Sequence, residues 1–211
     1  MATNNTNTQE AFISGYAVVF DTPSRPMECP SIYGSGPFVE YLHRGAFADM
    51  LARGDEVKLL VAHDTSLVLA STRSGTLELR EDAYGLAFQA TLDLRQTYAN
   101  DVVIAIKRRD VVGMSFKLDV PVNGDKWTRQ SDGLRRRDIY RLSTPEITIT
   151  GFPAYPSTSV GIGEWRELSD NMKLKLERVS KLMQEAEDDR RRRAADAIQK
   201  KLEIIKRIQS I

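Results

Sequence analysis

The stretch that decides the class of fold is TLELREDAYGLAFQATLDL, residues 76–94. Its second half places an apolar side chain at every second position, which is the period of a β-strand with one buried face. Those positions are Leu86, Phe88, Ala90, Leu92 and Leu94. Between the two halves, Asp82 to Gly85 offer the residue types that a tight turn requires. The stretch therefore predicts a β-hairpin.

Similar short strand patterns lie on both sides of this hairpin. They cover residues 12–20, 56–64, 111–120 and 139–156. Residues 44–54 and 97–110 show helical spacing instead, and the first of these ends at a glycine that suits a helix C-terminus. The polar segment at 123–138 is expected to be an excursion between strands. Together, the patterns predict a mainly β fold with short helices (α+β), in which about seven strands form a closed or partly closed barrel with flanking helices.

The composition argues against several classes of function. With 30 Lys and Arg against 29 Asp and Glu, the chain has no global charge that would attract nucleic acid or a membrane. The single cysteine, Cys29, excludes an internal disulfide, and two histidines do not make a zinc cluster. There is no phosphate-binding glycine motif, no secretory leader and no run of about 18 apolar residues. We therefore expect a cytoplasmic protein with no metal, no cofactor, no nucleic-acid partner and no membrane span.

The last part of the chain has a different character. Residues 164–211 contain no proline or glycine, and apolar side chains recur there at intervals of four and three. The first of these are Met172, Leu176, Val179, Met183 and Ala186. The spacing predicts a long helix or helical hairpin that buries one stripe against a partner helix, so we expect a homo-oligomer. The chain is thus divided into a disordered tail at 1–11, a folded domain at 12–163 and a helical tail at 164–211.

A second stretch, VVGMSFKLDV at 111–120, carries the candidate nucleophile. Read as a half-buried strand, it places Gly113 and Ser115 on its polar face, which leaves room for a substrate beside a serine hydroxyl. A serine is a weak nucleophile, so it needs a base within hydrogen-bond reach and a third group that orients the base. The alternative reading of Ser115 is an ordinary exposed serine on a strand.

Only two histidines can supply the base. His63 closes an apolar strand pattern, whereas His43 lies just before a short helix among charged neighbours. Glu146, at the start of EITIT, is the natural third member. The residues alone leave ordinary alternatives open: a half-buried strand-end histidine, a surface histidine and a solvated glutamate. A Cys29–His43 pair is a further alternative, although no helix N-terminus adjoins Cys29 to favour its thiolate form.

Several blocks of the sequence resemble the prohead, or capsid maturation, proteases of tailed bacteriophages. In chain order the blocks are GYAVVFD (15–21), EYLHRGAF (40–47), VKLLVAHD (57–64) with its hairpin, GMSFKL (113–118) and EITITGFPAYPST (146–158). No single block is decisive, but their order and spacing agree over residues 12–161. The resemblance implies a fold like that of the herpesvirus assembly protease, to which this family is related.

The resemblance also implies roles for individual residues. It makes Ser115 the nucleophile, His63 the base and Glu146 the third member of a catalytic triad, while His43 matches no position of the triad. The implied activity is that of a serine endopeptidase that cleaves scaffolding segments of the major capsid protein, and itself, inside the procapsid in the host cytoplasm. Residues 134–138, LRRRD, are a candidate counterpart of the arginine-bearing loop that helps form the oxyanion hole in the viral relatives.

Two other functions remain open at this stage. The chain could be a scaffolding or assembly protein that acts through its C-terminal helix and carries a vestigial protease body. The joint presence of Ser115, His63 and Glu146 in matching blocks argues against that reading. Nucleic-acid binding through residues 190–193, a run of four arginines, is weaker still, because the preceding acidic residues nearly neutralise the run and no aromatic side chain accompanies it.

Overall fold

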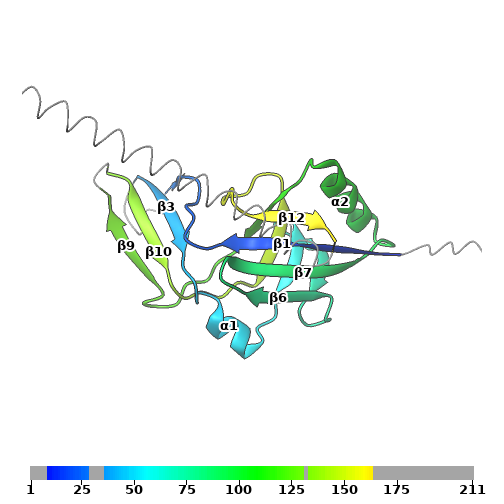
Figure 1. Cartoon of the computed structure of the whole chain (residues 1–211), viewed down its shortest axis with the longest axis horizontal. Coiled ribbons are helices and arrows are strands. Elements are labelled where there is room, and N and C mark those ends of the chain that lie inside the picture. Colours follow the sequence, from blue (N-terminus) through cyan, green and yellow to red (C-terminus); the bar gives the residue numbers. More distant parts are fainter. Residues whose placement is uncertain (1–8, 29–35, 131–132, 164–211) are drawn as a thin grey trace, which may run out of the picture. The chain divides into compact units, whose positions relative to one another are not determined.

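The computed structural model describes residues 9–28, 36–130 and 133–163. The predicted helical tail at 164–211, most of the predicted N-terminal tail and Cys29 therefore lie outside the described residues. Within those residues the protein is mainly β, with two short helices and three four-stranded sheets. The mainly β class predicted from the sequence is confirmed (Figure 1).

The first sheet contains the predicted hairpin. Its strand order is β12 (Ser159–Ile162), β1 (Glu10–Val19), β7 (Gly85–Asp93) and β6 (Leu77–Glu81), and all neighbours are antiparallel. The Asp82 carboxylate accepts hydrogen bonds from the backbone N–H groups of Tyr84 and Gly85, which fixes the turn between β6 and β7. β1 begins two residues before the predicted domain start, because Glu10 already pairs with Asp93.

The third sheet carries the candidate site. Its order is β5 (Asp64–Ser71), β4 (Lys58–Val61), β11 (Glu146–Thr150) and β8 (Gly113–Phe116). β11 is parallel to β4 and antiparallel to β8, so it lies between β8, which carries Ser115, and β4, whose end leads into the turn that carries His63. The predicted strand at 111–120 is shortened to four residues, and all four are buried.

The second sheet corrects the prediction for residues 123–138. This polar segment is no excursion: it contains β9 (Asp125–Arg129) and β10 (Arg135–Ile139), which pair with each other. β10 also runs parallel to β3 (Pro37–Leu42), and these two strands lie beside β9 in Figure 1. β2 (Met27–Glu28) pairs with β3 and completes the order β2-β3-β10-β9. The strands escaped prediction because their charged side chains are paired with one another, as described below.

The predicted barrel is not seen in the strand pairing of the described residues, which gives three sheets and no closed ring of strands. The junction between β8 and β12 shows why. The buried hydroxyl of Thr158 accepts from the Met114 N–H at 3.0 Å and lies 2.8 Å from the Met114 carbonyl, so a side chain occupies the edge of β8 where a neighbouring strand would pair. One backbone hydrogen bond, from the Val160 N–H of β12 to the carbonyl of Val112 just before β8, also joins these two segments.

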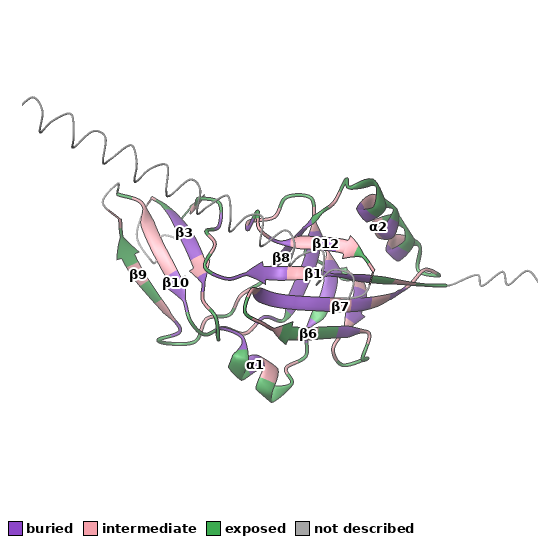
Figure 2. Ribbon diagram, viewed as in Figure 1, coloured by how far each residue is buried: buried purple, intermediate pink, exposed green. Residues whose placement is uncertain are grey.

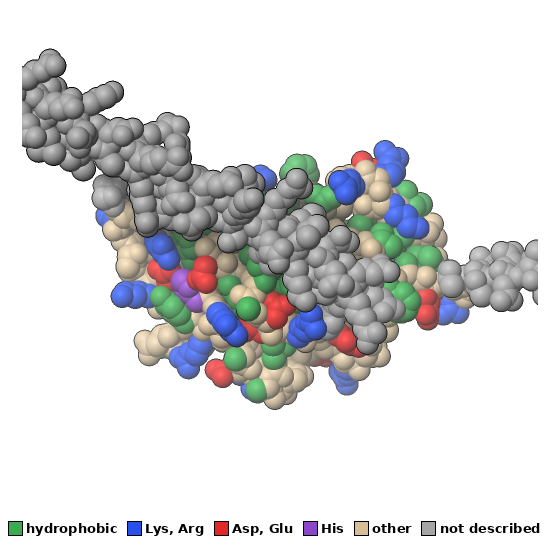
Figure 3. Space-filling view, viewed as in Figure 1, with side chains coloured by type: hydrophobic (Ala, Val, Ile, Leu, Met, Phe, Trp, Pro, Cys, Tyr) green, Lys and Arg blue, Asp and Glu red, His purple; other side chains and the backbone are tan. Residues whose placement is uncertain are grey.

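A single apolar cluster joins the sheets and the helices. α1 (Ala48–Arg53) contributes Met50, and α2 (Thr97–Arg108) contributes its inward-facing side chains at the predicted helical spacing. Figure 2 shows burial concentrated along β1 and β7 and on one side of α2. On the visible face, basic and acidic side chains are interspersed (Figure 3), in keeping with the near-neutral composition.

Candidate active site

Ser115 lies in the middle of β8, directly opposite Thr148 of β11. The residue is nearly buried, with 9% of its surface exposed. Gly113, two residues earlier, does not open the strand to substrate as its pattern suggested. A Cβ atom at Gly113 would come within 2.7 Å of Pro153 Cγ, so the glycine is required for the close packing of Pro153 against β8.

Glu146 is the first residue of β11 and is only 4% exposed. The alternative reading of a solvated glutamate is therefore wrong. Its Oε1 atom lies 2.6 Å from His63 Nδ1, whereas Oε2 is buried without a hydrogen-bond partner among the described residues. A buried carboxylate is costly unless it is paired, so the imidazole is the group that compensates this one.

His63 lies in a two-residue turn between β4 and β5, not on the strand that its pattern predicted. Val61 and Asp64 pair across this turn, and Ala62 and His63 both have positive φ, at 49° and 61°. Turns of this kind usually contain Gly, or Asn and Asp, whose short polar side chains tolerate the left-handed region; other residues cost about 1–2 kcal/mol there. In this turn the imidazole lies beside β8 and β11, where it contacts Ser115 and Glu146.

The three predicted residues are brought together by this arrangement. His63 Nε2 lies 3.1 Å from Ser115 Oγ, and His63 Nδ1 faces Glu146 at 2.6 Å. With the proton on Nδ1, the ring donates to the carboxylate and its Nε2 atom accepts the serine hydroxyl. The His63 side chain remains 37% exposed, so one side of the pair is open to an incoming substrate.

The strand that bears Ser115 packs against Tyr155, which belongs to a polar network that is buried at Tyr155 and Glu40 and partly buried beyond them. Phe116 packs against Tyr155 with ring centroids 5.2 Å apart, and the Tyr155 hydroxyl donates to Glu40 at 2.8 Å. Arg137 donates to Glu40 at 2.7 Å and to Asp125 at 2.6 Å, which links β3, β10 and β9. Burial, together with the neighbouring Glu40 carboxylate, raises the pKa of Tyr155 well above its ordinary value, so this hydroxyl stays protonated as a donor.

The other histidine belongs to a separate cluster. His43 Nδ1 contacts Asp21 and its Nε2 lies 2.7 Å from Asp138, while the ring stacks on Tyr140. Burial alone would raise the pKa of Asp138, but the hydrogen bonds from Arg136 and His43 outweigh it and leave that pKa below its ordinary value. His43 makes these contacts with carboxylates instead of with Ser115.

The arginines of residues 134–138 are engaged elsewhere. Arg136 is held by Asp138 and lies over the Tyr41 ring, and Arg137 is held by Glu40 and Asp125. Arg135 lies over the Trp127 ring of β9, 4.6 Å from its centroid. These contacts place all three guanidinium groups within the second sheet. We therefore do not assign any of these side chains to an oxyanion hole.

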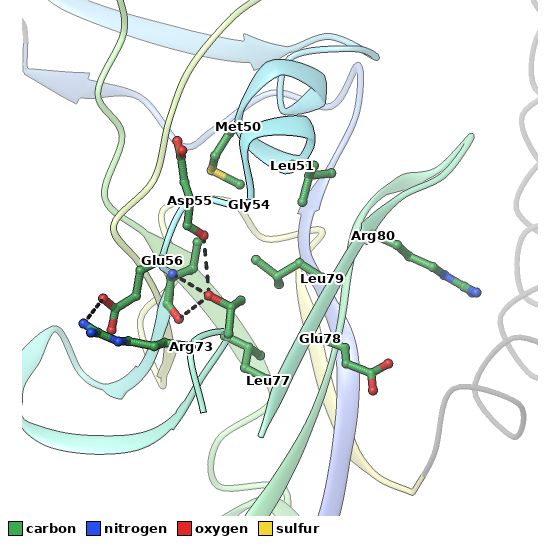
Figure 4. A pocket seen from close by; sticks show the side chains of 12 residues that line it. Met50, Leu51, Gly54, Asp55, Glu56, Arg73, Leu77, Glu78, Leu79 and Arg80 are labelled. Atoms are coloured by element: carbon green, nitrogen blue, oxygen red, sulfur yellow. Dashed lines mark hydrogen bonds and ion pairs between the residues drawn. The ribbon is translucent and has the colours of Figure 1, made fainter. Parts of the chain in front are cut away.

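A cavity elsewhere on the domain is separate from the triad. It has a volume of about 630 Å³ and lies between α1 and β6, with Leu51 and Leu79 on its walls and the Arg73–Glu56 ion pair at its edge (Figure 4). It opens at the beginning of β4, whereas His63 follows the end of that strand. Within the described part of the chain, no cluster of ligating side chains suits a metal ion, and no helix is long and apolar enough to cross a membrane.

A hydroxyl, an imidazole and a buried carboxylate in one hydrogen-bonded chain define the geometry of a serine hydrolase, in which the base activates the nucleophile and the acid orients the base. Comparison with known families agrees with this class. The model of the Caudovirus prohead serine protease family matches residues 1–174, and the chain belongs to that family. A search of curated proteins gave no match. Family membership implies a protease role in capsid maturation, as the sequence blocks predicted.

Two residues at the site were not singled out from the sequence. Thr148 contacts the backbone of His63, and Thr158 contacts the backbone of Met114. Both are buried and lie within the block EITITGFPAYPST. The alternation of EITIT was the available signal, because it places Thr148 on the same face of its strand as Glu146.

Proposed function

We propose that this protein is a serine endopeptidase in which Ser115 is the nucleophile, His63 the general base and Glu146 the residue that orients the base. The observation that carries the proposal is the contact of one imidazole with both partners, 3.1 Å to the Ser115 hydroxyl and 2.6 Å to the Glu146 carboxylate. This contact joins three strands or turns of one sheet that are far apart in the sequence. It is the arrangement that acyl transfer to a serine requires.

The proposed reaction follows from this geometry. Ser115 Oγ attacks the scissile carbonyl carbon while its proton passes to His63 Nε2, and the resulting imidazolium is stabilised by the Glu146 carboxylate. As the C–N bond breaks, Nε2 returns that proton to the leaving amine, and an ester with Ser115 remains. A water molecule, deprotonated in turn by His63, hydrolyses the ester and restores the free serine.

The proposed substrates are the scaffolding segment of the major capsid protein and the chain itself, inside the procapsid. Family membership supports the capsid protein as the class of substrate. We further propose that the segment at 164–211 recruits the enzyme to the shell or scaffold, or is removed by self-cleavage, and that it self-associates. No metal or cofactor takes part in the proposed reaction, because the triad supplies both the nucleophile and the proton transfer.

The test is cleavage of the capsid protein by the purified chain, with the fragments identified by mass. Ser115→Ala should lower turnover by roughly 10⁴-fold or more while the protein stays folded, and His63→Ala should be as damaging. Glu146→Gln should be milder but clearly impaired. Ser66→Ala, on the exposed part of β5, is the matched control and should cleave like the parent. If Ser115→Ala cleaves normally and Cys29→Ala is inactive, the nucleophile is the cysteine.

The same variant discriminates against the scaffolding alternative. An assembly protein with a vestigial protease body should support shell formation and maturation equally well with Ser115→Ala. The endopeptidase proposal instead requires that shells assembled with this variant retain their scaffolding segments. Intact-mass analysis of capsid protein from such shells distinguishes the two outcomes.

A further inference from the structure

The backbone at His63 is held from outside its own turn. The His63 N–H donates to the Thr148 hydroxyl oxygen at 2.9 Å, although the two residues are far apart in the sequence. The next N–H toward the N-terminus, that of Ala62, donates to the Ile149 carbonyl at 2.9 Å. Both bonds reach β11, so this strand fixes the two residues whose φ angles are positive.

Thr148 occupies a special position on β11. It is 0% exposed, it faces Ser115 in the strand register, and it follows Glu146 by two residues on the same side of the strand. One strand face therefore presents two acceptors to a single histidine. Glu146 receives the ring N–H and Thr148 receives the backbone N–H, so both the orientation of the ring and the position of its backbone are set by β11.

We propose that Thr148 is a positioning residue for His63 and that its hydroxyl keeps the strained turn in the conformation in which Nε2 reaches Ser115. The inference rests on the proposed role of His63 as base. Without the hydroxyl, the His63 N–H loses the partly buried bond that ties it to β11, and the turn is free to relax toward a conformation with less strain. The imidazole then moves relative to a serine that β8 holds fixed.

The hydroxyl can be tested separately from the methyl group of Thr148. Thr148→Ser keeps the hydroxyl, Thr148→Ala removes it together with the methyl, and Thr148→Val replaces it with a methyl of similar size. Serine and alanine at this position differ by one oxygen atom, so their comparison remains valid even if the valine variant does not fold. Thr91→Val, on β7 of the first sheet, is the control for a threonine substitution remote from the site.

The probe is a fluorophosphonate, which loses fluoride when a serine oxygen attacks its phosphorus atom. Labelling of the full chain over a range of probe concentrations separates the maximal rate from the half-saturating concentration. Thr148→Ala and Thr148→Val should lower the maximal rate by about 10- to 100-fold with little change in half-saturation, because the reacting groups are misplaced by a fraction of an ångström to 1 Å. Thr148→Ser should stay close to the parent, and so should Thr91→Val.

A second readout does not require activity. The proton on His63 Nδ1, shared with Glu146, is expected to give a far-downfield proton resonance in the parent. That resonance should persist in Thr148→Ser and shift or broaden in Thr148→Ala. Parent-like labelling and an unchanged resonance in Thr148→Ala would overturn the role of Thr148 even if Ser115→Ala is inert. Equal labelling of Ser115→Ala and the parent would instead refute the proposed nucleophile, and the resonance would then decide alone whether Thr148 positions the ring.

Discussion

The packing of Pro153 against Gly113 gives a prediction whose size follows from the structure. A Cβ atom at Gly113 would lie 2.7 Å from Pro153 Cγ and 3.2 Å from Pro153 Cβ and Cδ. Carbon atoms in contact are normally about 3.5–4.0 Å apart, so Gly113→Ala requires a relative movement of roughly 1 Å. A proline ring is fixed to its backbone and cannot rotate away as a flexible side chain would.

Neither partner of this contact can move freely. Gly113 pairs with Thr150 of β11, and Pro153 follows the same strand by three residues. Overpacking of a well-packed site costs about 1–3 kcal/mol, whereas the lower entropy of the unfolded alanine chain returns only about 0.4–1 kcal/mol. We therefore expect Gly113→Ala to be destabilised, with a Tm lower by up to about 10 °C for a domain of this size.

The assay is thermal unfolding of the parent, Gly113→Ala, Pro153→Ala and the double variant. Pro153→Ala removes Cγ and Cδ, so Gly113→Ala should cost about 1 kcal/mol less in that background. Gly151→Ala is the matched control, because a Cβ there would meet nothing within 4 Å. Equal Tm values for Gly113→Ala and Gly151→Ala, or the same cost of Gly113→Ala in both backgrounds, would refute the steric reasoning.

Three further predictions concern the rest of the domain. The pKa of Asp138 is lowered in the folded state, so the ionised carboxylate contributes its full stabilisation above about pH 4 and loses it as the pH falls through the folded pKa. Asp138→Asn should therefore make the free energy of unfolding, measured with urea, depend less on pH in the acid range. Tyr155→Phe removes a buried donor to Glu40 and should cost about 1–3 kcal/mol in urea unfolding, and an unchanged midpoint would show that the network does not support β8. Truncation after Gly163 keeps the hydrogen bonds of that residue to β1, so the Tm should be preserved while light scattering shows less self-association. An insoluble product would show that the segment at 164–211 belongs to the core. Undiminished self-association would show that this segment is not the oligomerisation element.

The sequence predicted the parts of the fold in which one face of an element is buried. The hairpin at 76–94 and α2 both have such a face, and in each case the apolar period survives in the structure. β8 is different, because all four of its residues are buried and Pro153 packs against Gly113. The alternation of apolar and polar residues at 111–120 therefore predicted a longer strand, with a more exposed polar face, than the structure has. β9 and β10 were missed because their charged side chains are paired: Arg137, for example, binds Asp125 and Glu40. Strand prediction relies on alternating apolar residues, and such ion pairs produce no alternation of that kind.

The candidate site was predicted largely through family resemblance. Ser115, His63 and Glu146 each had an ordinary alternative when read alone, and only the order of the blocks favoured a triad. The contacts between them depend on the turn at Ala62 and His63, whose positive φ angles are not encoded by the usual turn residues. The alternation of EITIT places Thr148 on the same face as Glu146, but it does not show that the Thr148 hydroxyl meets the backbone of a residue in a separate turn. The catalytic roles themselves remain predictions.

The role of Ser115 as nucleophile is tested by identifying the residue that a fluorophosphonate modifies. The full chain is incubated with the probe, digested, and mapped by mass spectrometry beside the Ser115→Ala and His63→Ala variants. We expect a single adduct on the peptide that contains Ser115, none in Ser115→Ala, and an adduct formed roughly 10⁴-fold more slowly in His63→Ala. An adduct on another serine, or labelling of Ser115 that is indifferent to His63, would contradict this expectation.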